Sequence, residues 1–180
     1  AERWTGAKPA RSHLKWRIRN IVYSSPSALI LMSMGVDDCA ILTPPPSKAD
    51  KFGILWGSKP LYLPFHPTDA INACRFLRRM VLSQPCQDHL KATTPLFVNP
   101  ETNDAFTPSL LDRLLPQMLQ ATGLSVAESR RYSWHSFRIY LCTALFNAGV
   151  PDGVIQAMLR WATPESANEY KRFSQESYTH

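Results

Sequence analysis

The stretch that decides the fold runs from Trp134 to Tyr170 and reads WHSFRIYLCTALFNAGVPDGVIQAMLRWATPESANEY. In it, His135 and Arg138 stand three positions apart, Trp161 follows Arg138 by twenty-three positions, and Tyr170 follows Trp161 by nine. Residues three apart share one face of a helix, so we expect the histidine and the arginine to lie together near a helix N-terminus, where anions are favoured. An imidazole, a guanidinium, an indole and a phenol thus recur in a fixed order within one short stretch.

Three helices are expected in this stretch. The first opens at the HSFR segment and ends at Asn147-Ala148-Gly149, and the second follows Pro151 and runs over 152 to about 160. The third covers 165–173 and carries Tyr170. The residues expected to be buried are Ile139, Leu141, Ala144 and Leu145 in the first helix and Val154, Ile155, Met158 and Leu159 in the second.

This arrangement resembles a known family. The pattern H-x-x-R, then a Trp or His preceded by Gly or Arg, then a Tyr nine residues later looks like the C-terminal catalytic half of the tyrosine recombinases, which include the phage integrases. The segments HSFR, AGVPDGVIQ and RW are most similar to the recombinases of eukaryotic mobile elements, the DIRS-like retroelements and the Cryptons. The resemblance implies a mainly helical α+β fold, the helical tyrosine-recombinase catalytic fold with a small antiparallel β-sheet. It covers residues 13–180, with residues 1–12 as a loose N-terminal end.

The resemblance also implies a reaction, in which double-stranded DNA is broken and rejoined through a 3′-phosphotyrosyl intermediate. Tyr170 would be the nucleophile. The fork of Arg138 would stabilise charge on the non-bridging oxygens of the phosphate, His135 would hydrogen-bond the same phosphate, and Trp161 would donate its indole N–H. No metal and no cofactor is expected. Taken singly, a tryptophan such as Trp161 is more often a core residue, and a tyrosine such as Tyr170 is usually a surface aromatic.

A fifth catalytic candidate lies in the N-terminal half. The segment PPSKAD, residues 45–50, resembles the S-K-T-D motif of mobile-element recombinases, in which a lysine on a hairpin loop reaches the DNA. Lys48 would then protonate the leaving oxygen, a task that suits a compact ammonium on a flexible stem. The alternatives are an ordinary exposed turn lysine, or Lys51 in its place.

The residues around this loop predict a small antiparallel sheet. HLKWRIRNIVY, residues 13–23, alternates apolar and basic residues as one half-buried strand does. A second strand is expected over 38–43, ended by Pro44-Pro45-Pro46, and a third through 60–63.

Two amphipathic helices and a basic loop are expected between the sheet and the HSFR segment. The first helix, 68–84, is capped by Thr68, and the second, 107–122, has Pro108 in its first turn, a kink at Pro116, and Gly123 after its end. The apolar face of the first carries Ile71, Cys74, Leu77 and Val81. The candidate DNA-contacting arginines are Arg75, Arg78 and Arg79 on its other face and Arg130 and Arg131 in the loop 125–132. A solvated charged face is the alternative for the three on the helix. Lys51 is a further candidate for a DNA contact.

Composition agrees with a DNA-binding protein without selecting one. A net charge of +6 and a pI near 9.3 favour polyanionic partners. There is no apolar run of transmembrane length and no signal-peptide pattern, so we expect a soluble intracellular protein, nuclear if its host is eukaryotic and cytoplasmic otherwise. The four cysteines form no C-x-x-C pair and are expected to be buried reduced thiols, Cys39, Cys74, Cys86 and Cys142.

One departure from the family pattern stands out. The first of the two family arginines usually lies in a Leu-Arg-x-x-Glu context before the hairpin lysine, and no such context occurs here. The chain begins with Ala rather than Met. We therefore expect a fragment that lacks the first-arginine segment and the N-terminal DNA-clamping domain, is inactive alone, and belongs to a protein that forms a tetramer on DNA.

Three alternatives remain open. A domesticated relative would bind DNA without cleaving it. A type IB topoisomerase uses related chemistry but generally lacks a histidine at the H-x-x-R position, so His135 argues against it. An unrelated helical interaction domain would scatter Lys48, His135, Arg138 and Tyr170.

Overall fold

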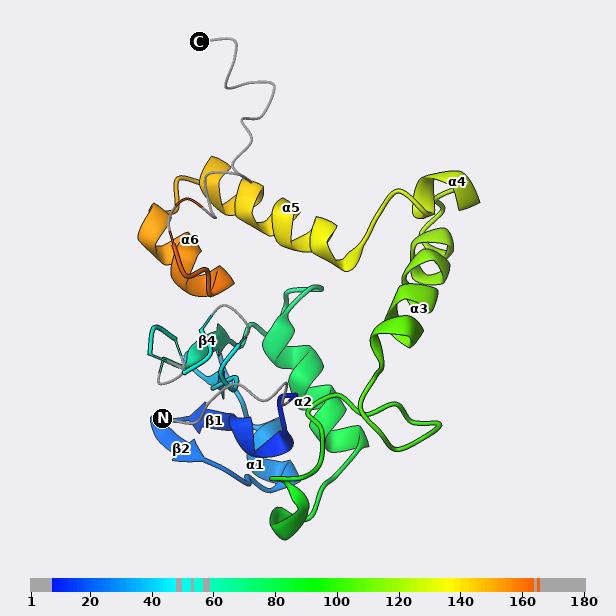
Figure 1. The fold of residues 1–180 in the computed structure, drawn as a ribbon. Coiled ribbons are helices and arrows are strands. Elements are labelled where there is room, and N and C mark those ends of the chain that lie inside the picture. The colour runs from blue at the N-terminus through cyan, green and yellow to red at the C-terminus, as the bar shows by residue number, and fades with distance from the viewer. Residues whose placement is uncertain (1–7, 48–49, 53, 57–58, 164, 166–180) are drawn as a thin grey trace. The chain divides into compact units, whose positions relative to one another are not determined.

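The computed structural model describes residues 8–47, 50–52, 54–56, 59–163 and 165. The chain divides into two compact units, Ala1–Ala105 and Phe106–His180. The first unit holds a four-stranded antiparallel sheet and helices α1 and α2, and the second holds helices α3 to α6 (Figure 1). The predicted α+β fold, mostly helical with a small antiparallel sheet, is confirmed. The predicted range of a single catalytic domain, 13–180, stays a prediction.

The sheet lies in the first unit and has the order β2-β1-β3-β4. Its strands are β1 Leu14–Ile18, β2 Ile21–Tyr23, β3 Cys39–Leu42 and β4 Leu61–Pro64. Trp16 pairs with Tyr23 on one side and Ala40 on the other. The apolar residues of β1 alternate onto one face, where Leu14, Trp16 and Ile18 are buried. The predicted alternation of β1 is therefore confirmed.

The single strand predicted over residues 13–23 is wrong, because the chain reverses in its middle. Arg19 and Asn20 both have positive φ, 50° and 64°, which is the conformation of a tight two-residue hairpin turn. The buried carboxylate of Asp38 accepts the Arg19 N–H at 2.8 Å and the Gly35 N–H at 2.8 Å. Because this turn contains no glycine and is held by a residue distant in sequence, the local pattern gave no sign of it.

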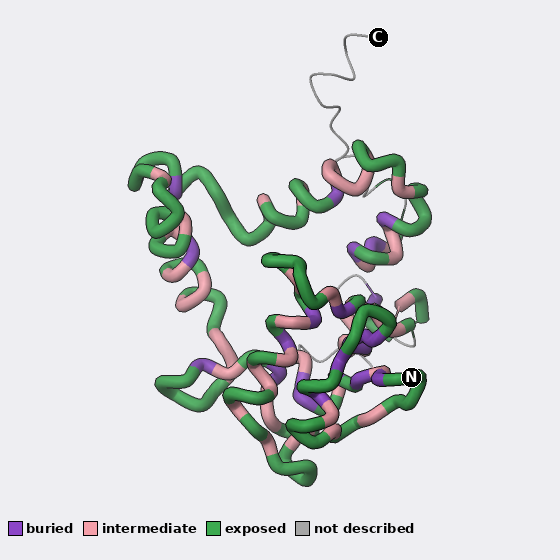
Figure 2. Tube along the Cα trace, turned by 180° about the vertical axis from the view of Figure 1, so that it is seen from behind, coloured by how far each residue is buried: buried purple, intermediate pink, exposed green. Residues whose placement is uncertain are grey.

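Helices α1 Ala28–Met32 and α2 Ala73–Ser83 supply the rest of the first core. Figure 2 shows the buried segments gathered inside the unit, and the cluster joins Trp16 of the sheet to Leu31 of α1 and Leu77 of α2. Helix α1 was not predicted.

The start of α2 was placed too early. Its N-cap is Asn72, whose side chain accepts the Arg75 N–H at 3.0 Å. Thr68 is therefore not the cap, and Ile71, expected on the apolar face, precedes the helix and is 90% exposed.

Part of the expected loose N-terminal end is packed. Residues Arg11–His13 form a short 3-10 helix, and Ala10 makes a β-bridge with Pro95. The guanidinium of Arg11 is buried and donates to the backbone and side-chain oxygens of Gln84, at the end of α2, at 3.1 and 3.2 Å. The favourable field at a helix C-terminus helps to offset the burial of this charge. A second 3-10 turn, Asp88–Leu90, lies in the connection after α2.

The second unit begins with α3 Pro108–Ala121 and the short α4 Val126–Ser129. Helix α3 has the expected ends, because the Thr107 side chain accepts the Leu110 N–H at 3.2 Å and Gly123 has φ +100°. The segment 125–132 was predicted as a loop and instead contains α4. Ser125 caps that helix by accepting the Glu128 N–H at 3.2 Å. The Ser125 hydroxyl and backbone N–H in turn donate to the Glu128 carboxylate, at 2.6 and 2.9 Å, and lower the pKa of that carboxyl. Among the described helices, none combines the length and the apolar character that crossing a membrane requires.

The buried cysteines allow a test of the first core. Burial is the largest cause that raises the pKa of the Cys74 thiol, from 9.0 to about 11, and the nearby Cys39 adds to it. The folded state thus holds this proton more tightly than the unfolded chain. The stabilisation that results is complete below pH 9 and is lost as the pH rises to about 11. We predict that denaturant unfolding will show a steeper loss of stability from pH 8 to 11 in the unchanged protein than in Cys74→Ala. Equal slopes would contradict this placement of Cys74.

Candidate active site

The HSFR segment opens helix α5, Trp134–Asn147, as predicted. Gly149 follows its end with φ +73°. Two hydrogen bonds of 3.0 Å close the helix: the Gly149 N–H donates to the Phe146 carbonyl, and the Val150 N–H donates to the Leu145 carbonyl. This pair defines a Schellman ending, which favours glycine at its left-handed position. Helix α6, Asp152–Leu159, begins after Pro151, so the two helices predicted here are confirmed, and they pack together as a helical hairpin.

Helix α6 ends in the same way, with an arginine at the left-handed position. Arg160 has φ 51° and ψ 44°. Its N–H bonds to the carbonyl of Ala157 at 3.2 Å, and the N–H of Trp161 bonds to that of Gln156 at 3.1 Å. The Gln156 side chain donates back to the Trp161 carbonyl at 3.2 Å. These bonds turn the chain so that the indole of Trp161 returns to the helices.

Trp161 completes a small core between α5 and α6. The cluster contains Cys142, Ile155, Leu159 and Trp161, all buried. The expected buried faces were only partly right. Ile155 and Leu159, four positions apart on one face of α6, are buried. Val154 and Met158 lie beside that face and are each 46% exposed. In α5 the buried residue is Cys142, whereas the predicted Leu141 is 42% exposed.

Arg138 lies over the Trp161 ring, with its guanidinium carbon 5.2 Å from the ring centroid. One of its terminal nitrogens also donates to the carbonyl oxygen of Leu159, at the C-terminal end of α6. A cation over an indole contributes about 0.5–1 kcal/mol at an exposed site, and a helix C-terminus adds favourable field. Together the two contacts fix the plane of the guanidinium at the surface of the small core.

His135 lies one helical turn before Arg138 and is exposed. The spacing places both residues on one face of α5. Arg130 and Arg131 are also exposed and lie just before the helix. The structure therefore places three of the five predicted catalytic residues, His135, Arg138 and Trp161, on one helical hairpin.

The other two predicted catalytic residues, Lys48 and Tyr170, lie outside the described residues, as does the expected third helix from residue 166 onward. Lys51 is exposed in the connection between β3 and β4 of the first unit. That connection contains a residue whose role the sequence did not reveal. Asp50 is buried, and its carboxylate accepts three backbone N–H groups from residues 54–56. The only hint was its place in the SKAD motif.

The three arginines of α2 differ from one another. Arg78 packs within its own unit, 4.5 Å from the Phe65 ring centroid and with a bond of 3.4 Å to the Leu31 carbonyl. Arg75 donates to the Asp69 carbonyl at 2.5 Å, and Arg79 is exposed. Of the three, Arg79 has the side chain best placed for an external ligand.

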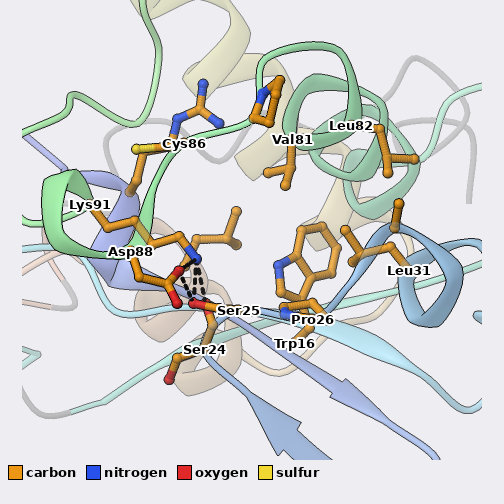
Figure 3. Close-up of a pocket in the computed structure, with 14 residues that line it drawn as sticks. Trp16, Ser24, Ser25, Pro26, Leu31, Val81, Leu82, Cys86, Asp88 and Lys91 are labelled. Carbon is orange, nitrogen blue, oxygen red and sulfur yellow. Dashed lines mark hydrogen bonds and ion pairs between the residues drawn. The ribbon is translucent and has the colours of Figure 1, made fainter.

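A cavity of about 270 Å³ lies in the first unit, and none of the predicted site residues lines it. Its wall includes Trp16 and Leu31, and Asp88, Lys91 and Ser25 form a polar network at one side (Figure 3). Asp88 bonds to Ser25 at 2.6 Å and to Lys91 at 2.9 Å, and these contacts lower the pKa of its carboxyl.

Arg138, fixed on Trp161, and His135, one turn away, lie near the N-terminus of α5. Together they can bind an anionic oxygen, as an enzyme that acts on phosphate requires. Residues 57–177, well over half of the chain, match the sequence model of the Phage integrase family. The chain therefore belongs to the phage integrase family, and membership implies a DNA-binding tyrosine recombinase that breaks and rejoins DNA. No curated protein and no solved structure matches the chain. The matched range includes the whole stretch from His135 to Tyr170 and begins after Lys48.

The left-handed turn at Arg160 yields a stability prediction. A β-branched residue there adds strain of about 1–2 kcal/mol, whereas asparagine tolerates the conformation. Both substitutions remove the arginine side chain, so their difference isolates the backbone effect. We expect thermal or denaturant unfolding to show Arg160→Val less stable than Arg160→Asn by that amount. Equal stabilities would mean that the turn is not left-handed.

Proposed function

We propose that this protein is a site-specific recombinase whose nucleophile is Tyr170 and whose intermediate is a 3′-phosphotyrosyl link to DNA. The observation that carries the proposal is the arrangement of Arg138, which is fixed on Trp161 and the end of α6 one turn from His135. Family membership supports the reaction class. The finer assignment of residues rests on the spacing of the motif together with this geometry.

In the proposed mechanism Tyr170 gives its phenol proton to His135, and the phenol oxygen attacks the scissile phosphorus and forms a P–O bond. The bond to the 5′ oxygen breaks, and Lys48 supplies the proton that leaves a free 5′ hydroxyl. Arg138 and His135 donate hydrogen bonds to the non-bridging oxygens, where charge develops. Attack by a 5′ hydroxyl of a partner strand reverses these steps and frees the tyrosine, so the number of phosphodiester bonds is conserved.

Trp161 has two roles in the proposed mechanism. Its ring holds the guanidinium of Arg138, and its indole N–H is a donor for the phosphate. The first role explains why a large aromatic residue suits this position even though it is buried in the small core.

We further propose that duplex DNA is the partner and that Arg130, Arg131, Arg75, Arg79 and Lys51 contact its phosphates. The net charge of +6 supports this, since each neutralised phosphate releases counterions. Arg78 is a weaker candidate than we expected because it packs on Phe65. We also propose a tetramer on DNA and an origin in a mobile element, on the resemblance of HSFR, AGVPDGVIQ and RW.

The nucleophile can be tested by isolating DNA that stays covalently attached to the intact protein after denaturing lysis. We expect a 3′-linked adduct from the unchanged protein and none from Tyr170→Phe, because the phenylalanine lacks the attacking oxygen. Tyr140→Phe, at an exposed tyrosine of α5, is the matched control and should retain the adduct. Equal recovery from Tyr170→Phe and the unchanged protein would refute the assignment, and no adduct from either would favour a DNA-binding relative without cleavage.

The role of Arg138 can be tested by replacement with lysine. Lysine keeps the charge but lacks the planar fork, so we expect adduct formation to slow by about 10²–10³-fold, the usual cost of removing one transition-state donor. Arg113→Lys on the exposed side of α3 is the control and should leave the rate unchanged. If both variants cleave at the original rate, Arg138 does not contact the phosphate.

A further inference from the structure

The connection between β3 and β4 exposes an unusual number of apolar side chains. Phe52 is 51% exposed, Ile54 76% and Leu55 41%. Water-facing apolar groups this close together in a short loop commonly mark an interaction surface. We call these three residues the apolar tip.

The chain that carries the apolar tip is held in a defined shape. The buried carboxylate of Asp50 accepts the N–H of Ile54 at 2.9 Å, of Leu55 at 3.1 Å and of Trp56 at 2.8 Å. Bonds of 3.0–3.2 Å between Ser47 and Asp50 hold Asp50 in place just before the apolar tip. Charge-assisted bonds to backbone N–H groups are among the stronger hydrogen bonds in proteins. The backbone of Ile54 and Leu55 in the apolar tip is therefore held before any partner binds.

The charge around the apolar tip fits a polyanion. Lys51 is exposed beside it, and Lys59 lies 4.9 Å from the Trp56 ring centroid. Asp50 is the only acidic residue in the sequence between Cys39 and Thr68, and its carboxylate is buried under the loop. DNA combines both features that this loop can complement, because its phosphates surround stacked apolar bases.

We propose that the apolar tip enters the minor groove of DNA and wedges open a base step, while Lys51 contacts the adjacent phosphates. The proposal rests on the proposed function, because it takes duplex DNA as the partner. Phe, Ile and Leu are the side chains that minor-groove proteins insert between bases, and the cost of unstacking is repaid by added contact with the bent DNA. Steps such as TA open most easily, so the apolar tip favours them without forming hydrogen bonds to bases.

Base unstacking can be measured directly. The probe is a short duplex in which 2-aminopurine replaces the adenine of a central TA step, since its fluorescence rises when the base unstacks. We expect the intact protein to raise this fluorescence, and Phe52→Ser and Ile54→Ser each to lose most of the rise at saturating protein. Ile71→Ser is the matched control, because Ile71 is 90% exposed in the same unit, outside the loop, and should retain the full rise.

The other outcomes overturn the proposal at different points. A full rise with Phe52→Ser and Ile54→Ser means that the apolar tip does not insert. Binding by the unchanged protein without any rise refutes the wedge but leaves the recombinase assignment intact, whereas failure to bind duplex DNA refutes both. The same substitutions could instead break up an oligomer of the DNA-free protein in solution and leave the fluorescence increase unchanged. In that case the apolar tip is a protein interface.

Discussion

The contact between Arg138 and Trp161 determines the geometry of the candidate active site. It exists because α6 ends in a left-handed turn at Arg160, which sends the indole back into the core shared with α5. The same turn leaves the Leu159 carbonyl where the guanidinium can bond to it. A flexible side chain of high rotamer entropy is thereby oriented before any phosphate arrives, and that preorganisation is what electrostatic stabilisation of a transition state requires.

Local patterns predicted well what depends on neighbours in sequence. The ends of α3, α5 and α6 were predicted from residues such as Thr107, Gly149 and Pro151, because capping is a matter of a few consecutive residues. The face shared by His135 and Arg138 follows from helical spacing alone. The hairpin at Arg19-Asn20 and the bond from Arg138 to the Leu159 carbonyl were missed, because each depends on groups that only the folded chain brings together. The local caps of α1, α2 and α4 were also missed, although each lies within a few residues of its helix.

Charged residues of the first unit show why counting basic residues overstates a DNA interface. Arg11 is buried against the end of α2, and Arg78 packs on Phe65. The carboxylates of Asp38 and Asp50 are likewise buried and organise one turn and one loop through backbone N–H groups. These four charges shape the unit itself. The sequence shows their number and sign, but the direction in which each side chain points is a property of the tertiary fold.

The central claim is that His135 and Arg138 hold the phosphate that Tyr170 attacks. Its most direct test is an experimental structure of the intact protein bound to DNA at its cleavage site. The account predicts the scissile phosphate at hydrogen-bond distance, about 3 Å, from both His135 and Arg138, with the guanidinium still over Trp161. A scissile phosphate held by other residues, with Arg138 turned away from it, would contradict the account.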